Sequence, residues 1–153
     1  MKKFLKVTLI IALVLLGIFL LDQGLRLILD AQLNTCRKAY EKLEQANAHY
    51  LVYDNDELQG KADSIPIRWS SVEREFKAEK DKEAHMITFY SHDADGCCGG
   101  KLYSKHIFAY DADWNMVGYC VIQYEDPAFG EMKMRSKRTY KVCCFDKETC
   151  TAE

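Results

Sequence analysis

Residues 7–21 read VTLIIALVLLGIFLL, a stretch that contains no charge and only one hydroxyl, that of Thr8. Three lysines precede it: Lys2, Lys3 and Lys6. A membrane-spanning helix needs about 20 apolar residues, and further apolar residues on both sides extend the stretch toward that length. Residues 1–29 are therefore predicted to form a membrane anchor, with residues 4–21 in contact with the lipid bilayer.

A cleaved secretory signal is the alternative interpretation of this segment. Signal cleavage needs small residues three positions and one position before the cut, just after the apolar run. Cleavage after Gly24 would place Asp22 at the outer of these positions, and cleavage after Ala31 would place Leu29 there. The sequence therefore favours an uncleaved anchor.

The distribution of basic residues predicts the orientation. Three lysines flank the run on its N-terminal side, whereas Arg26 is the one cation close behind it. Positive flanks stay in the cytoplasm. We therefore expect a single-pass protein of the inner or plasma membrane, with a cytoplasmic N-terminus and residues 30–153 on the extracytoplasmic side.

Charge and composition argue against a nucleic-acid-binding protein and against a disordered chain. The 21 basic and 23 acidic residues give a net charge of −2, which leaves no basic surplus for a nucleic acid. Aromatic residues make up 12% of the chain and only two residues are proline, which argues against a disordered tail. A small folded domain without a nucleic-acid partner is expected.

The spacing of apolar residues predicts an α+β fold, a transmembrane and stalk helix followed by a small disulfide-rich antiparallel sheet. Residues 30–53 have the three- and four-residue spacing of an amphipathic helix, expected to continue to about Tyr50, and a loop is expected over 54–60. Residues 54–153 form the predicted cysteine-rich β domain of four or five strands. Strands are expected at 76–79, 85–90, 102–110, 116–124 and 138–145, with residues 70–73 as a competing short helix.

Seven cysteines in so short a chain predict disulfides and an oxidising compartment. Six lie near the C-terminus and are the disulfide candidates: Cys97, Cys98, Cys120, Cys143, Cys144 and Cys150. Three bridges among six cysteines can be drawn in about 15 ways, so the pairing stays open. Cys36 stands apart on the predicted stalk helix, where packing is favoured over an intermolecular bond or a bond to a core cysteine.

One segment carries a cluster of potential metal ligands: His92, Asp93, Asp95, Cys97 and Cys98, with His106 shortly after. Imidazole, carboxylate and thiolate groups together bind zinc or copper. The spacing matches no specific metal motif, and the glycines around the cysteines equally suit a loop pinned by disulfides, which is the favoured interpretation. No cofactor is expected.

The order of a long N-terminal helix, an antiparallel sheet and a cysteine-bearing C-terminal segment resembles that of type IV pilin subunits. The resemblance covers arrangement only, because the apolar run has no early glutamate and no glycine precedes a phenylalanine at a processing site. It implies no function here. The sequence favours a non-enzymatic extracytoplasmic module that binds a protein, as an accessory, assembly or immunity-type factor. The alternative is a metal-handling or thiol-redox protein.

Overall fold

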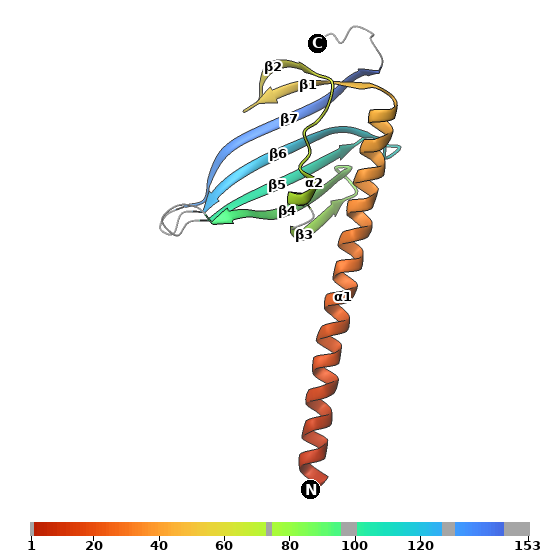
Figure 1. Cartoon of the computed structure of the whole chain (residues 1–153), viewed down its shortest axis with the longest axis vertical. Helices are drawn as coiled ribbons and strands as arrows, with labels where there is room; N and C mark the ends of the chain where they lie inside the picture. The colour runs from red at the N-terminus through yellow and green to blue at the C-terminus, as the bar shows by residue number, and fades with distance from the viewer. Residues whose placement is uncertain (1, 73–74, 96–100, 127–130, 146–153) are drawn as a thin grey trace. The chain divides into compact units, whose positions relative to one another are not determined.

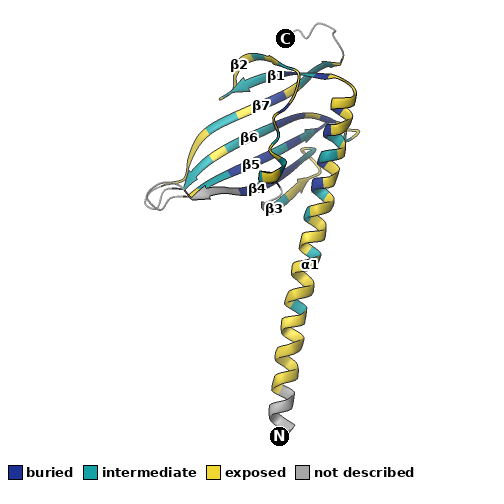
Figure 2. Cartoon of the chain, in the orientation of Figure 1, coloured by how far each residue is buried: buried dark blue, intermediate teal, exposed yellow. Residues whose placement is uncertain are grey.

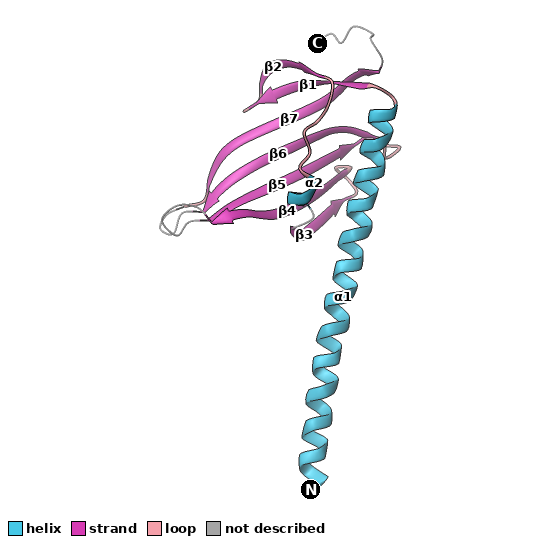
Figure 3. Cartoon of the chain, in the orientation of Figure 1, coloured by secondary structure: helices cyan, strands magenta, loops and turns pink. Residues whose placement is uncertain are grey.

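The computed structural model describes residues 2–72, 75–95, 101–126 and 131–145, with only the backbone for 2–6, 75–77 and 92–95. The chain divides into two compact units, residues 1–32 and 33–153. The elements are labelled in Figure 1 and coloured by type in Figure 3. In chain order they are α1 (Lys2–Gln45), β1 (Ala48–Asp54), β2 (Glu57–Ala62), α2 (Trp69–Val72), β3 (Glu75–Asp81), β4 (Met86–Asp95), β5 (Lys101–Tyr110), β6 (Met116–Asp126) and β7 (Lys133–Phe145).

The first unit is the N-terminal part of α1, and its apolar side chains are exposed (Figure 2). Every large apolar side chain from Val7 to Ile28 in this segment is more than half exposed, and Leu21 and Leu27 reach 70%. Apolar side chains all around a helix require an apolar environment. The helix is long and apolar enough to cross a membrane.

α1 ends at Gln45, earlier than the sequence predicted. Asn47 has a positive φ of 50°, and its N–H donates to the carbonyl oxygen of Glu44 at 3.1 Å. Asparagine tolerates this left-handed conformation, which closes a helix and redirects the chain. The prediction that the helix continues to Tyr50 is therefore wrong. Tyr50 lies in β1, and its spacing from Leu43 fits a helix only by coincidence.

The second unit is built on one antiparallel sheet of seven strands, in the order β2-β1-β7-β6-β5-β4-β3 (Figure 1). Strands β3 to β7 form a continuous meander, and the β1–β2 hairpin joins it beside β7. The predicted hairpins of residues 76–90 and 102–124 are confirmed. The sheet has more strands than expected, because β1 and β2 lie where the end of the helix and a loop were predicted.

The inner face of the sheet carries the core. Leu33, Cys36, Tyr40 and Leu43 of α1 belong to the same buried cluster as side chains of β1, β4, β5, β6 and β7. Phe108 lies at the centre, edge-on to Phe89 at 5.7 Å and stacked on Trp69 of α2 at 5.8 Å. Each fully buried side chain of this size contributes roughly 1.5–3 kcal/mol.

The outer face is formed by the residues that alternate with those of the inner face. Its central members are Tyr53, Tyr90, Tyr103, Lys105, Ile107, Cys120, Ile122, Tyr124, Lys137, Thr139 and Lys141. None of them belongs to the buried cluster under α1 and α2. Within the second unit, α2 and the part of α1 from Leu33 onward therefore cover one side of the sheet.

Candidate functional site

Three neighbouring strands change from apolar to polar at the same level of the inner face. On β5, β6 and β7, the cross-strand row of Phe108, Tyr119 and Tyr140 is buried and aromatic. The next row is His106, Val121 and Arg138, and the one after it is Ser104, Gln123 and Ser136. A core-facing row of polar residues violates the pattern that a sheet needs for burial, and such violations concentrate at functional sites.

The chain between β2 and β3 covers this polar area. These two strands lie at opposite edges of the sheet, so residues 63–72 must cross from one edge to the other. Ile65 fixes the crossing segment, because its side chain is buried and its carbonyl oxygen accepts a hydrogen bond from the Tyr40 hydroxyl at 3.1 Å. Pro66, Arg68 and Ser71 of this segment face the sheet across a cavity.

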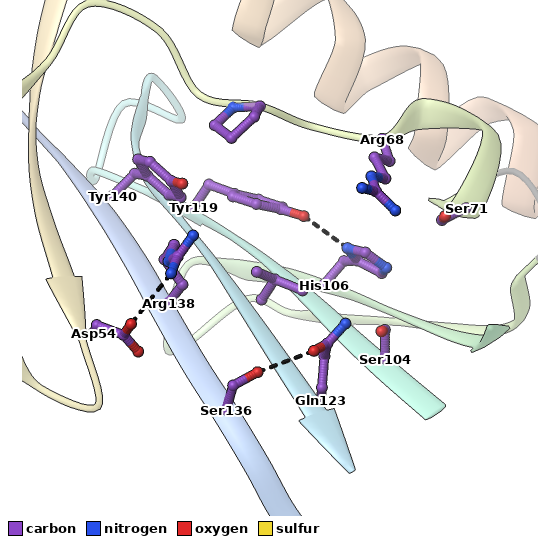
Figure 4. A pocket seen from close by; sticks show the side chains of 12 residues that line it. Asp54, Arg68, Ser71, Ser104, His106, Tyr119, Gln123, Ser136, Arg138 and Tyr140 are labelled. Atoms are coloured by element: carbon purple, nitrogen blue, oxygen red, sulfur yellow. Dashed lines mark hydrogen bonds and ion pairs between the residues drawn. The ribbon is translucent and has the colours of Figure 1, made fainter. Parts of the chain in front are cut away.

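The cavity has a volume of about 480 Å³ and is shown in Figure 4. It is lined by Asp54, Pro66, Arg68, Ser71, Ser104, His106, Tyr119, Val121, Gln123, Ser136, Arg138 and Tyr140. Most of these side chains carry hydrogen-bonding groups. The volume of the cavity falls within the roughly 300–1,000 Å³ of small-molecule sites. It is the candidate functional site.

Two arginines and one aspartate set the charge of this site. The Arg138 guanidinium donates to the Asp54 carboxylate at 3.2 Å, and these side chains are 54% and 34% exposed. The carboxylate and the Tyr140 hydroxyl raise the pKa of Arg138 above its ordinary value, the aspartate being the larger cause. Among the described residues, Arg68 has no carboxylate within 4.0 Å, so the lining has one uncompensated positive charge.

Both ring nitrogens of His106 are hydrogen-bonded within the protein. Its Nε2 lies 3.2 Å from the Ser91 hydroxyl, its Nδ1 lies 2.7 Å from the Tyr119 hydroxyl, and the residue is only 4% exposed. Ser91 is fully buried, so a ligand in the cavity has no access to its hydroxyl. The three groups satisfy one another in the core, which is what buried polar side chains require.

The chain matches no family model, no curated protein and no solved structure.

The predicted metal cluster is only partly within the described residues. His92, Asp93 and Asp95 lie on β4, where the backbone alone is described, and Cys97 and Cys98 lie outside the described residues. His106 is described, and both of its ring nitrogens are already hydrogen-bonded. The metal-handling and thiol-redox alternative stays a prediction, and His106 has a structural partner at each nitrogen.

The described cysteines differ in environment. Cys36 is a fully buried thiol whose sulfur accepts a hydrogen bond from the Tyr110 hydroxyl at 3.1 Å, as the favoured packing role requires. Cys120, a predicted disulfide candidate, is a free thiol that accepts a bond from the Thr139 hydroxyl at 3.3 Å. Among the described cysteines, no two sulfurs lie at bonding distance; the Cys143 and Cys144 sulfurs are 3.9 Å apart.

The strand register places Cys143 and Cys144 at the end of the sheet opposite the start of β5. β5 begins at Lys101, level with Asp126 of β6, and the start of β7 at Lys133 lies at the same end. Residues 143–144 are ten positions further along β7, where they pair with the beginning of β1. At about 3.3 Å per residue, that separation is about 33 Å.

Cys97, Cys98 and Cys150, the other disulfide candidates, lie outside the described residues. The pairing of the cysteines therefore stays a prediction.

Sequence reasoning did not single out the cavity. Its signal was present, because β5 reads polar at Ser104 and His106 and aromatic at Phe108 and Tyr110 on one face. Only the register shows that β6 and β7 change at the same level.

Proposed function

We propose that the chain is a single-pass membrane protein whose extracytoplasmic β domain acts by binding another protein rather than by catalysis. The apolar, exposed segment of α1 supports the membrane attachment, and the lysines before it support a cytoplasmic N-terminus. Residues 33–153 then form the binding domain on the other side.

The observation that carries the protein-binding role is the composition of the outer face. Antiparallel sheets that face water usually present polar residues there. Here Tyr103, Ile107, Ile122 and Tyr124 lie close together on β5 and β6, and each of them is half-buried. Tyrosine and aliphatic residues in one patch are typical of protein interfaces.

Lysines surround this aromatic patch. The Lys141 ammonium lies 4.9 Å from the centre of the Tyr53 ring, and that of Lys105 lies 5.7 Å from the Tyr90 ring. Lys137 pairs with Asp56 at 2.7 Å. Lys105 and Lys141, which take no part in this ion pair, favour a partner that presents acidic groups around an apolar centre.

The two edges of the sheet argue against an alternative mode of binding, the addition of a partner's strand. β3 reads EFKAEKD and β2 reads ELQGKA, so both edge strands carry lysines and acids. Charged edge strands oppose pairing with another chain. The face rather than the edge is therefore the proposed interface.

Site-specific photocrosslinking of the full chain in its own membranes tests this function. A photoreactive residue replaces Ile122, at the centre of the outer face, or, as the control, Leu58, which is 47% exposed on β2. We expect a protein adduct of one defined mass from position 122 only, lost after Lys105→Glu. Equal adducts from both positions, or adducts unaffected by the charge reversal, would count against the proposal.

A further inference from the structure

We infer that the cavity on the inner face is a binding site for a small hydroxylated monocarboxylate of about the size of a sugar acid. This site lies on the side of the sheet opposite to the proposed protein interface, so the inference goes beyond the proposed function. It rests on the charge, the hydrogen-bonding groups and the size of the cavity.

The charge of the lining selects an anion with one negative charge. Arg138 and Asp54 compensate each other across 3.2 Å. Arg68 is then the cation that lacks a carboxylate within the described part of the chain. Guanidinium groups bind carboxylates through two parallel hydrogen bonds, which makes Arg68 the group that recognises the anion.

The position of Arg68 suits this role. Trp69, which follows it, is fixed in α2 by its stacking on Phe108 and by the Arg37 guanidinium, which lies 5.4 Å from the centre of its ring. Figure 4 shows Arg68 extending from the crossing segment toward His106 and the sheet below. A short rigid element therefore presents the guanidinium to the cavity.

The remaining polar groups select hydroxyl groups on the ligand. Ser71 lies on the crossing segment, Ser104 lies on β5, and on the far side the Ser136 hydroxyl donates to the Gln123 side-chain oxygen at 3.0 Å. The amide nitrogen of Gln123 is a donor that this bond leaves available to a ligand. Neutral donors and acceptors on opposite walls match a ligand with several hydroxyls between them.

The size and polarity of the cavity exclude simpler ligands. About 480 Å³ is far more than an inorganic anion fills, so an anion bound to Arg68 would leave most of the cavity, including the Gln123 amide on the far side, out of contact with the ligand. The apolar surface of the lining, from Pro66, Val121 and the rings of Tyr119 and Tyr140, is interrupted by charged and hydroxyl groups, which does not suit a fatty acid chain. A compact ligand with one carboxylate and many hydroxyls uses the whole surface.

Titration of the full chain in detergent micelles with D-glucuronate, D-gluconate and quinate tests the inference. D-Glucose is the neutral control and acetate is the carboxylate without hydroxyls. Saturation-transfer NMR detects contact, and calorimetry gives Kd. We expect at least one of the three hydroxy acids to bind about tenfold or more tightly than both controls, and added salt to weaken its binding.

Variants link the binding to the cavity. Arg68→Gln should weaken binding about tenfold or more, and Arg68→Lys should restore part of the loss, because lysine keeps the charge without the planar pair of donors. Arg135→Gln is the control for the loss of an arginine: Arg135 lies on β7, pairs with Glu125 at 3.3 Å and does not line the cavity. Unchanged thermal unfolding shows that the variants fold.

Three results would overturn the inference. They are the absence of binding by all three hydroxy acids up to about 20 mM, equal binding of glucose, and binding that Arg68→Gln and Arg135→Gln reduce alike. None of these depends on the outer face, so the photocrosslinking result and the titration can fail independently.

Discussion

Replacement of Cys36 by alanine should destabilise the domain by about 2–4 kcal/mol, a large effect for the loss of one sulfur atom. The Cys36 thiol is fully buried, and removal of a group of this size costs about 1 kcal/mol before any cavity is counted. The larger part comes from Tyr110, whose hydroxyl donates to the sulfur at 3.1 Å and is left unpaired in the core. A buried hydroxyl without a partner costs about 1–3 kcal/mol.

A double-mutant cycle separates the two contributions. Tyr110→Phe removes the donor and leaves only a weak acceptor behind, so it should cost about 0.5–1.5 kcal/mol. In that background Cys36→Ala no longer leaves an orphaned hydroxyl, and its cost should fall to about 1–2 kcal/mol. The two changes are therefore expected to be coupled by about 1–2 kcal/mol.

Urea unfolding of the full chain in detergent micelles, followed by tryptophan fluorescence, measures these free energies of unfolding. Cys120→Ala is the control, because this thiol is only partly buried and its donor, the Thr139 hydroxyl, lies on the outer face. Its cost should stay below about 1 kcal/mol. If the Cys36 and Tyr110 costs simply add to within about 0.5 kcal/mol, the sulfur is not the partner that the hydroxyl needs.

Other perturbations test other parts of the structure. Burial, followed by the charge of Glu44, raises the pKa of Tyr50 to about 12. The unfolded chain therefore loses this proton at lower pH than the folded chain, and the stability should fall between about pH 10 and 12. Tyr50→Phe should reduce this fall in thermal unfolding, and an unchanged dependence of stability on pH would contradict the burial of the hydroxyl. Gly118→Ala should cost about 1–3 kcal/mol by urea unfolding, because the new Cβ would lie 2.8 Å from a backbone carbonyl oxygen, whereas Gly24→Ala meets nothing within 4 Å and should be nearly neutral. His106→Gln should lower stability by about 1–3 kcal/mol without a change in the metal content of the purified protein measured by mass spectrometry; a loss of bound metal would instead support the metal-handling alternative.

The elements that the sequence predicted correctly are those with long local patterns. The charge-free run of residues 7–21 and the alternating residues of 102–124 each carry their periodicity over many positions. β1 was missed because Leu43 and Tyr50 continue a helical spacing, and only the left-handed Asn47 reveals the change. β2 was missed because it is short, mostly exposed and without a run of alternating apolar residues.

The candidate site was harder to predict because it depends on alignment between distant segments. Arg68 and Arg138 are seventy positions apart, and only the crossing of the β2–β3 connection brings both to the same cavity. The pairing of cysteines is a similar case. Their number predicts disulfides, but the pairing depends on which distant segments lie together, and Cys97, Cys98 and Cys150 lie outside the described residues.

The position of β7 sets the order in which the domain can fold. β1 follows the anchor helix directly, yet its two neighbours in the sheet are β2 and β7, and Val52 pairs with Tyr140 near the C-terminus. Contacts between segments so far apart in the chain form slowly, because a long loop must close before they can form. If the domain lies outside the membrane as proposed, nearly the whole chain must cross the membrane before the N-terminal hairpin finds its place. During that interval Tyr50 and the apolar side of the meander lack the packing contacts of the folded domain. Chaperones that bind unfolded chains after export would therefore be expected to bind this protein.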